Sequence, residues 1–323
     1  MKLAILKCHG SGNDFILIDE TVAGNDAIQD ETRAHLTKTL CDREDGVGSD
    51  GILFYQPAES ADCRMRMFNP DGSEAEMCGN GLRCIGRYCS ERLMKPEVTV
   101  ETMKVILPVR REKQIFAGIE TFEAEIGPVS LLQESLPMNV DSGFLIDEII
   151  EDLSSNLKFT AISVPNPHIV TIVSDIDEAF VAQCGDKANH LSLFPKGVNV
   201  SFVKPLGENR IFVVTYERGV GVTYSCGTAM SASAYVSVLQ GISEADQPIS
   251  VYNKGGMVEC DVSDRKGNIL LKGNATFVYE ATIDVKDGCG SIEHQYKSKV
   301  RLDEISAYSI LQDYAKSILE KTA

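Results

Sequence analysis

The sequence MCGNGLRC (residues 77–84) has a counterpart of the same kind at YSCGTAMSA (residues 224–232), which indicates a duplicated fold. In both stretches a cysteine stands directly before a glycine, and a helical pattern follows. After Cys78, apolar residues recur at steps of three and four until Pro96, which predicts one buried helical face. That face consists of Leu82, Ile85, Cys89 and Leu93.

The second cysteine precedes an alanine-rich run. Behind Cys226, the sequence AMSASAYVSVLQ aligns Ala232, Val236 and Leu239, and Gly241 is placed to end the helix. The small side chains of this run would let neighbouring strands approach closely. We therefore predict that each cysteine begins a helix, and that both helices are core elements wrapped by sheet.

Most of the remaining pattern is typical of strands. Predicted strands cover residues 64–69, 98–107, 161–164, 198–203, 210–217 and 268–273, and two further helices cover residues 31–40 and 147–157. Strands, cysteine motif, helix and strands thus occur twice in order, which indicates a weak internal duplication. We predict an α+β fold with an N-terminal half over residues 1–128 and a C-terminal half over residues 129–284. Both cysteine-bearing helix starts are expected to face one cleft.

Composition limits the classes of partner. The 323 residues carry 31 basic and 47 acidic side chains, a formal net charge of −16, and no long basic run. Such a chain repels phosphate backbones and anionic lipids, so we expect neither nucleic acid nor membrane as a partner. The N-terminus MKLAILKCHG lacks a signal-peptide pattern, and no apolar run approaches the ~20 residues that cross a bilayer. We expect a soluble, cytoplasmic protein.

The ten cysteines are scattered, and no C-x-x-C pair occurs among them. A disulfide framework is typical of short secreted chains, so most of these thiols are interpreted as small buried hydrophobes, and we expect no metal site. Cys78 and Cys226 are the exceptions. A helix N-terminus carries partial positive charge and unpaired N–H groups, so we expect a lowered thiol pKa there and a site for a carboxylate.

Each of these cysteines, with the helix start behind it, forms one half-site. Two half-sites that bind the same amino acid would place a thiol on each side of its α-carbon. One thiolate could remove the α-proton while the opposite thiol delivers another, inverting the configuration without a cofactor. Cys84 and Cys89 are interpreted as core residues of the first helix. A single Cys-Gly pair at a helix start is more often structural, and the duplication is what favours chemistry.

Several motifs together resemble the diaminopimelate epimerase family. The cysteine segments FNPDGSEAEMCGNGLRCIGRY (residues 68–88) and YERGVGVTYSCGTA (residues 216–229) carry the resemblance, with CHGSGNDF (8–15), NPHIV (166–170) and GVNVSFV (197–203) in family order. YNKGGMVEC and LLKGNATFVYEA resemble the closing strands, so the likeness spans roughly residues 1–284.

The resemblance implies two pseudo-symmetric domains, each a mainly antiparallel sheet or barrel wrapped around one central helix. It also implies interconversion of LL- and meso-diaminopimelate, on the bacterial route to lysine and cell wall, without pyridoxal phosphate or another cofactor. Cys78 and Cys226 match the acid–base pair, with Cys226 as the base in the LL-to-meso direction. His168 and Glu217 match positions that adjust the ionisation of the cysteines.

The resemblance further assigns substrate-binding residues. Four neutral side chains would contact the zwitterionic ends of the substrate, namely Asn13, Asn69, Asn166 and Asn199. Backbone N–H groups of Gly79, Asn80, Gly227 and Thr228 would bind the reacting carboxylate. Arg218 would form a bidentate pair with the distal carboxylate, beside Glu217.

This sequence departs from the family at a few positions. Val222 follows Gly221 where many members have glutamate, and Gly51 stands where some have a substrate-binding glutamine. Ala229 and Met230 replace smaller residues after the second cysteine. These departures concern the distal end of the substrate rather than the reacting carbon.

Residues 285–323 have no counterpart in the family motifs. KDGCGSIEHQYKSK is polar and is predicted to be a linker. The following residues, 303–322, place apolar side chains on one helical stripe, which predicts an amphipathic helix packed on the body or on a partner subunit. The stripe consists of Ile305, Tyr308, Leu311, Ala315, Ile318 and Leu319.

Two alternatives to diaminopimelate epimerisation remain open from the sequence. One is a two-thiol racemase of the same fold that acts on another amino acid, such as histidine or proline. The other is an amino-acid-binding protein without turnover, against which both cysteines argue, because binding needs neither thiol. The expected ligand in every case is a small molecule, and a homodimer is the candidate assembly.

Overall fold

A computed structural model describes residues 2–25, 28–139, 143–263, 267–286 and 292–321. The chain forms two compact units. The first comprises residues 1–124 and 273–310, and the second comprises residues 125–272 and 311–323. Residues 273–284 thus belong to the first unit although the sequence assigned them to the second half. The reason is the pairing of β18 (Thr276–Val285) with the N-terminal strand β1 (Lys2–Gly10).

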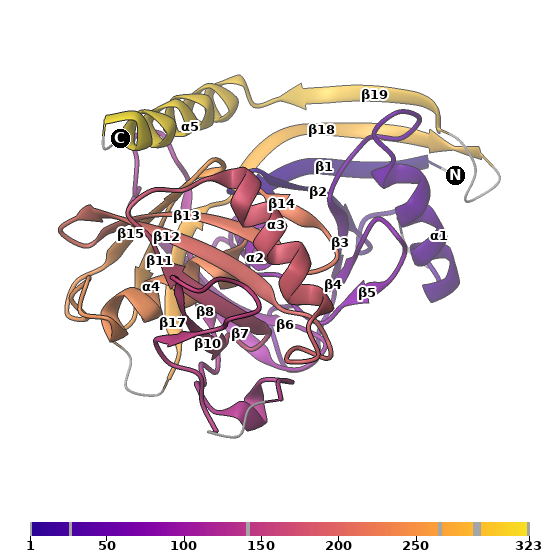
Figure 1. Ribbon diagram of the computed structural model, residues 1–323. Helices are drawn as coiled ribbons and strands as arrows, with labels where there is room; N and C mark the ends of the chain where they lie inside the picture. Colours follow the sequence, from indigo (N-terminus) through magenta and orange to yellow (C-terminus); the bar gives the residue numbers. More distant parts are fainter. Residues whose placement is uncertain (1, 26–27, 140–142, 264–266, 287–291, 322–323) are drawn as a thin grey trace. The chain divides into compact units, whose positions relative to one another are not determined.

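The first unit is a mixed sheet whose strand pairs follow chain order. β1 is antiparallel to β2 (Asn13–Asp19), β2 is parallel to β3 (Gly51–Gln56), and β3 is antiparallel to β4 (Cys63–Phe68). β4 pairs with β5 (Glu74–Ala75) and runs parallel to β6 (Glu97–Glu101), and antiparallel pairs link β6, β7 (Ile106–Glu112) and β8 (Thr121–Ile126). Figure 1 shows β1, β18 and β19 (Ile292–Val300) side by side.

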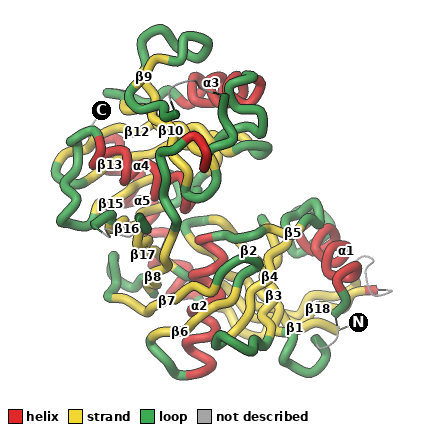
Figure 2. The backbone as a smooth tube through the Cα atoms, turned by 90° about the horizontal axis from the view of Figure 1, so that it is seen from below, coloured by secondary structure: helices red, strands yellow, loops and turns green. Residues whose placement is uncertain are grey.

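Helix α2 (Gly79–Leu93) is the central helix of the first unit, and it contacts β1, β2, β3, β4, β6 and β7 (Figure 2). Leu82, Ile85 and Cys89 are fully buried in its core cluster, as their spacing predicts. Leu93 is 38% exposed and does not continue this face, because the last turn leaves the sheet and ends at Met94 in the left-handed region. Helix α1 (Asp30–Cys41) connects the parallel strands β2 and β3 and confirms the helix predicted over residues 31–40.

The second unit repeats the same sequence of pairings. β10 (Lys158–Ser163) is antiparallel to β11 (Pro167–Ile172), β11 is parallel to β12 (Asn199–Gly207), and β12 is antiparallel to β13 (Arg210–Glu217). β13 pairs with β14 (Gly221–Thr223) and runs parallel to β15 (Ile249–Asn253), and antiparallel pairs link β15, β16 (Gly256–Asp261) and β17 (Ile269–Asn274). The duplication predicted from the cysteine motifs therefore extends to strand direction.

The helices of the second unit lie at the same positions in the strand order as those of the first. Helix α3 (Glu178–His190), capped by Asp177, connects the parallel pair β11 and β12 as α1 connects β2 and β3. Helix α4 (Gly227–Leu239) is the central helix and contacts β10, β11, β12, β13, β15 and β16. Its alanine and serine side chains are buried, as predicted, and Gly241 follows its end with φ 70°. Leu239, expected on the buried face, is 42% exposed because it lies in the last turn.

Two local predictions are wrong. Residues 147–157 form no helix: the two-residue strand β9 (Glu148–Ile149) pairs with β10, and turns follow it. Their apolar residues recur with a helical period, but the segment pairs with β10 as a short strand instead of forming a helix. The single strand predicted over residues 98–107 is two strands, β6 and β7, because the backbone turns at Thr102, whose N–H and hydroxyl both donate to the Val105 carbonyl.

The described part of the C-terminal extension forms a strand and a helix, so the predicted linker is wrong where the strand lies. Within residues 286–299, predicted to be a linker, residues 292–299 belong to β19, which pairs antiparallel with β18; residues 287–291 lie outside the described part. Helix α5 (Leu302–Lys321) confirms the predicted amphipathic helix, with Tyr308, Leu311 and Ala315 buried. Within the described residues, no helix has the length and apolarity needed to span a bilayer.

Candidate active site

Cys78 occupies the N-cap position of α2, so the helix begins directly behind the thiol. Its backbone is extended, with φ −144° and ψ 114°, and its sulfur accepts a hydrogen bond from the Gly81 N–H at 3.5 Å. The predicted N–H donors Gly79 and Asn80 are the first two helical residues and have no intrahelical acceptor. The first unit therefore places a thiol beside the backbone N–H groups of one helix start.

Asn13 binds the thiol from the neighbouring strand β2. The Cys78 sulfur donates to Asn13 Oδ1 at 3.8 Å, and the Asn80 side-chain amide donates to the same oxygen at 3.3 Å. The Asn13 amide nitrogen donates to Asp50 at 2.8 Å, which fixes the orientation of Asn13. Asp50 in turn is ion-paired with Arg43 at 2.7 Å. The thiol is thus paired with a neutral, well-oriented acceptor.

Arg83 supports this arrangement from inside the unit. Its side chain is fully buried, and Nη2 donates to Asn80 Oδ1 at 2.8 Å and to the Ser11 hydroxyl at 3.2 Å. Asn80 is therefore held by Arg83 on one side while it donates to Asn13 on the other. Asn69 follows β4, and its amide donates to the Ser73 hydroxyl at 3.0 Å; no hydrogen bond among the described residues joins it to Cys78.

Cys226 occupies the equivalent N-cap position of α4. Its backbone is likewise extended, with φ −124° and ψ 115°, and Gly227 and Thr228 begin the helix. The Cys226 sulfur lies 3.4 Å from the Thr228 hydroxyl, which lies 3.2 Å from His168 Nε2. His168 Nε2 is also 3.0 Å from Asn166 Oδ1. Because a carboxamide oxygen only accepts, Nε2 carries the hydrogen and Nδ1 carries the lone pair.

Glu217 is the last residue of β13, and Arg218 follows it, at the edge of the same half-site. The Thr223 hydroxyl donates to the Glu217 carboxylate, which acts electrostatically on Cys226. The Arg218 backbone N–H donates to Asn199 Oδ1 at 2.9 Å, and its guanidinium donates to the Lys196 carbonyl at 2.7 Å. Arg218 is exposed, and no carboxylate of the described residues is ion-paired with it. Its remaining donors are available to a ligand.

The expected lowering of the thiol pKa values is wrong. Burial raises the pKa of Cys78 to about 11, although the Gly81 and Asn80 N–H groups act in the opposite direction. Burial also raises the pKa of Cys226 well above its ordinary value, and the negative charge of Glu217 raises it further. The loss of water around each sulfur outweighs the helix N-terminus. Both residues are therefore thiols at neutral pH.

His168 is neutral for the same physical reason. Its ring is fully buried, and burial, with a smaller contribution from the Arg218 charge, lowers its pKa to about 3. Among the described residues, its Nδ1 has no hydrogen-bond partner. A neutral imidazole beside Thr228 can position that hydroxyl without adding charge to the half-site.

Residues 5–114 and 160–278 match the sequence model of diaminopimelate epimerases. The chain is 47% identical over 289 residues to a diaminopimelate epimerase of Clostridium acetobutylicum, covering 88% of this chain and 86% of the relative. It is 42% identical over 294 residues to that of Listeria innocua, covering 87% and 88%. The chain belongs to the diaminopimelate epimerase family.

Solved structures of more distant proteins share the fold. A phenazine biosynthesis protein of the PhzF family from Bacillus anthracis superimposes with a TM-score of 0.64 at 17% identity, over 88% of this chain and all of that chain. A hydroxyproline epimerase from Agrobacterium vitis superimposes with a TM-score of 0.57 at 17% identity, over 90% and 94%. The α+β fold of diaminopimelate epimerases, predicted from the motifs, is confirmed.

As a member of this family, the chain has structural reasons for some of its departures. A Cβ atom on Gly51 would lie 2.8 Å from the Phe68 carbonyl oxygen, so β3 and β4 leave no room for a glutamine there. Ala229 and Met230 are buried in α4, and the Met230 sulfur accepts from the Asn253 amide at 2.9 Å. Val222 is 39% exposed and lines a hollow of roughly 250 Å³ with its neighbours Thr223 and Tyr224.

Sequence reasoning missed the residues that hold the half-sites in place. Asp50, Arg83 and Thr223 contact Asn13, Asn80 and Glu217 respectively, and none was singled out. Arg83 had a visible signal, since it is a charged residue three positions after Asn80 inside the GNGLRC motif. Asp50 and Thr223 lie in loop or edge-strand segments whose patterns carry no comparable signal.

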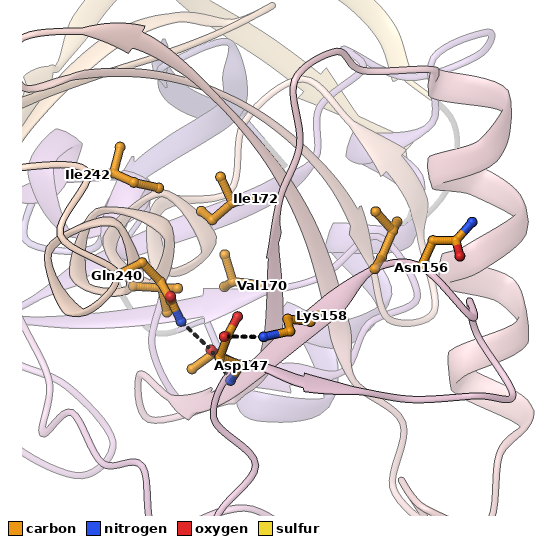
Figure 3. A pocket seen from close by; sticks show the side chains of 10 residues that line it. Asp147, Asn156, Lys158, Val170, Ile172, Gln240 and Ile242 are labelled. Carbon is orange, nitrogen blue, oxygen red and sulfur yellow. Dashed lines mark hydrogen bonds and ion pairs between the residues drawn. The ribbon is translucent and has the colours of Figure 1, made fainter.

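Figure 3 shows a separate hollow of about 240 Å³ in the second unit, at the C-terminal end of α4. Gln240 and the ion pair between Asp147 and Lys158 line its polar side, and Val170 and Ile172 line its apolar side. None of the predicted site residues lines it. Within the described residues, no cluster of three or more His, Cys, Asp or Glu side chains is placed to hold a metal ion.

Proposed function

We propose that this chain interconverts LL- and meso-diaminopimelate by two-base proton transfer between Cys78 and Cys226. One observation carries the proposal: each unit begins its central helix with a cysteine, at equivalent points of the same strand order. Membership of the diaminopimelate epimerase family supports the substrate. The reaction requires the two sulfurs to reach opposite faces of one α-carbon.

The chemistry needs only proton transfers. In the LL-to-meso direction, the Cys226 thiolate takes the α-proton, so that a C–H bond breaks and an S–H bond forms. The electron pair left on carbon delocalises into the adjacent carboxylate, which the N–H groups of Gly79, Asn80, Gly227 and Thr228 stabilise. The Cys78 thiol then gives its proton to the opposite face. The enzyme finishes with Cys226 as a thiol and Cys78 as a thiolate.

The surroundings of the two sulfurs suit these different tasks. Cys78 donates its hydrogen to Asn13 Oδ1, a neutral acceptor that keeps the sulfur protonated and ready to act as acid. Cys226 has Glu217 as a negative neighbour, which makes its thiolate strongly basic. A bound amino acid brings a positive ammonium group, and an opposite charge favours the thiolate. Substrate binding would therefore let the Cys226 thiol, neutral in the resting enzyme, release its proton to water and become the thiolate that the first step needs.

The distal end of the substrate is a second amino-acid group. Arg218 has donors left for a carboxylate, and its guanidinium geometry matches a bidentate pair. Asn199 holds the Arg218 backbone, and Asn166 lies beside His168. We assign the distal carboxylate to Arg218 and the distal ammonium to the neutral oxygens of these asparagines and of Asn69.

Chiral chromatography of the reaction mixture tests the proposal. The enzyme, without added cofactor, is incubated separately with LL-diaminopimelate, meso-diaminopimelate, L-proline and L-histidine. We expect conversion of the diaminopimelate isomers only. Cys78→Ala and Cys226→Ala should each abolish it, whereas Cys184→Ala, a buried cysteine of α3, should not. Turnover of proline or histidine alone would replace the proposed substrate, and no turnover of any substrate would reject the proposal.

A further inference from the structure

The beginning of helix α5 contacts the helix that carries Cys78. The Glu304 carboxylate accepts hydrogen bonds from both terminal nitrogens of Arg87, with Nη2 at 2.9 Å, and from the Phe277 backbone N–H at 3.0 Å. Arg87 lies in α2 and is 3% exposed. Its guanidinium also donates to the Ala275 carbonyl at 2.6 Å and lies 3.9 Å from the centre of the Phe277 ring.

This ion pair fixes the middle of α2. A buried guanidinium needs a carboxylate, and breaking such a pair leaves an uncompensated charge. Arg87 has a second partner in Glu91, one turn later, which accepts from its Nε at 2.8 Å and is shared with Arg111. Burial alone would raise the pKa of Glu304, yet its contacts with Arg87 and Phe277 bring it below the ordinary value. Glu304 is therefore charged and bound at neutral pH.

A second contact of α5 leads to the first turn of α2. The Tyr308 ring lies 4.1 Å from the His9 ring, centre to centre, and the Asn274 amide donates to His9 Nδ1 at 3.2 Å. The Asn274 carbonyl accepts from Arg83 Nε at 3.2 Å, and Arg83 holds Asn80. Asn80 donates to Asn13, the partner of the Cys78 thiol. A continuous path of contacts thus joins Tyr308 to the thiol.

We propose that α5 is an intramolecular brace for the Cys78 half-site, and that Glu304 and Tyr308 are positioning residues for proton transfer by Cys78. The proposal rests on the proposed function, because it assigns these residues a task in that reaction. Both residues lie outside the ranges that match the family, residues 5–114 and 160–278. The extension therefore adds support that the matched core does not contain.

The test uses the full-length chain with Glu304→Gln, which keeps the shape of the side chain and removes its charge. Alkylation of each cysteine by iodoacetamide is followed by peptide mapping, at a temperature below the unfolding transition. We expect Cys78 to react about threefold faster or more, because a loosened α2 exposes it, while Cys226 reacts at the wild-type rate. With LL-diaminopimelate, kcat should fall on the order of tenfold while KM stays nearly constant.

Matched variants separate positioning from stability. Asp313→Asn removes an exposed ion pair with Lys316 further along α5 and should change neither the alkylation rate of Cys78 nor kcat. Glu304→Asp, which keeps the charge, should recover part of kcat. Tyr308→Leu should also raise the alkylation rate of Cys78, through the contacts of Tyr308 with His9. If Glu304→Gln does not fold, the Tyr308→Leu result tests the brace.

Two results would overturn the brace. One is a folded Glu304→Gln or Tyr308→Leu protein with unchanged Cys78 alkylation and unchanged kcat. The other is failure of both variants to fold, which would make α5 part of the basic fold rather than a brace. A wild-type enzyme that is inactive on diaminopimelate would reject the proposed function instead. The alkylation result would then show whether α5 controls Cys78, independently of turnover.

Discussion

The Cys226 sulfur lies 3.4 Å from the Thr228 hydroxyl oxygen, two residues into the helix that Cys226 caps. The same hydroxyl lies 3.2 Å from the neutral imidazole of His168. Thr228 therefore links Cys226, the proposed base, to a buried histidine and also has its backbone N–H at the helix start. Its side chain and its backbone can be tested separately.

Thr228→Val removes the hydroxyl and keeps both the side-chain shape and the backbone N–H. We expect kcat to fall about tenfold, since the thiolate of Cys226 loses a hydrogen-bond donor, while KM changes little. Steady-state kinetics on LL-diaminopimelate measure this, and Thr228→Ser is the control that should retain most of the activity. A valine variant with wild-type kcat would show that the hydroxyl has no part in the reaction.

Arg218→Met should weaken substrate capture. The loss of a charge-assisted contact of about 1.5–3 kcal/mol predicts a KM roughly 10- to 100-fold higher, with a smaller change in kcat. Arg218→Lys should recover only part of this, because lysine cannot form the bidentate pair. An equal loss of kcat and kcat/KM, with KM constant, would instead place Arg218 in the chemical step.

Thiol reactivity should increase with pH without reaching a plateau near neutrality. The pKa of Cys78 is raised to about 11 by burial, so its thiolate fraction rises about tenfold per pH unit between pH 7 and 9. Iodoacetamide labelling of the ligand-free enzyme, mapped by peptide, measures this for Cys78 and Cys226. A plateau below pH 8.5 would mean that the helix N-terminus lowers the thiol pKa by more than burial raises it.

The same shift has a consequence for stability. A thiol whose folded pKa lies above its unfolded value of about 8.5 keeps its proton longer in the folded chain. Its contribution to the free energy of unfolding is therefore fully present below pH 8.5 and is lost as pH rises towards the folded pKa. His168 acts in the opposite range: its pKa is lowered to about 3, so stability falls as pH drops below about 6.5.

Oxidation offers a test of proximity between the two thiols. If both sulfurs reach one α-carbon, they can form a bond with each other when substrate is absent. We expect mild oxidant to inactivate the enzyme by joining Cys78 to Cys226, faster at alkaline pH because the thiolate is the reactive form. Reductant should restore activity, and substrate should protect. Peptide mapping under non-reducing conditions would disprove this if it finds inactivation with both cysteines unmodified.

The features that could be predicted from the sequence are those that repeated local patterns determine, namely the central helices and their buried faces. Two Cys-Gly motifs located both central helices, and the apolar steps after Cys78 identified most of the buried face. Residues 147–157 were misassigned because their helical period competes with pairing to a distant strand, which a local pattern does not record. For the same reason, the polar residues 292–299 concealed an edge strand.

The residues of the half-sites were easier to predict than their electrostatics. Cys78, Asn13 and Asn80 lie together, as do Cys226, Thr228 and His168. The direction of the thiol pKa shifts was wrong because it depends on burial by strands far away in the sequence. Supporting contacts such as Arg83 with Asn80 and Glu304 with Arg87 likewise depend on tertiary packing.

An isotope experiment in heavy water tests whether two different thiols act on the two faces of one carbon. LL-diaminopimelate is converted for a few per cent of the reaction, and substrate and product are separated and analysed by mass spectrometry. Two-thiol transfer predicts one deuterium at the inverted carbon of the meso product and none in the recovered LL substrate, because the proton acceptor and donor are separate groups. Deuterium appearing in recovered substrate as fast as in product, or product without deuterium, would contradict it.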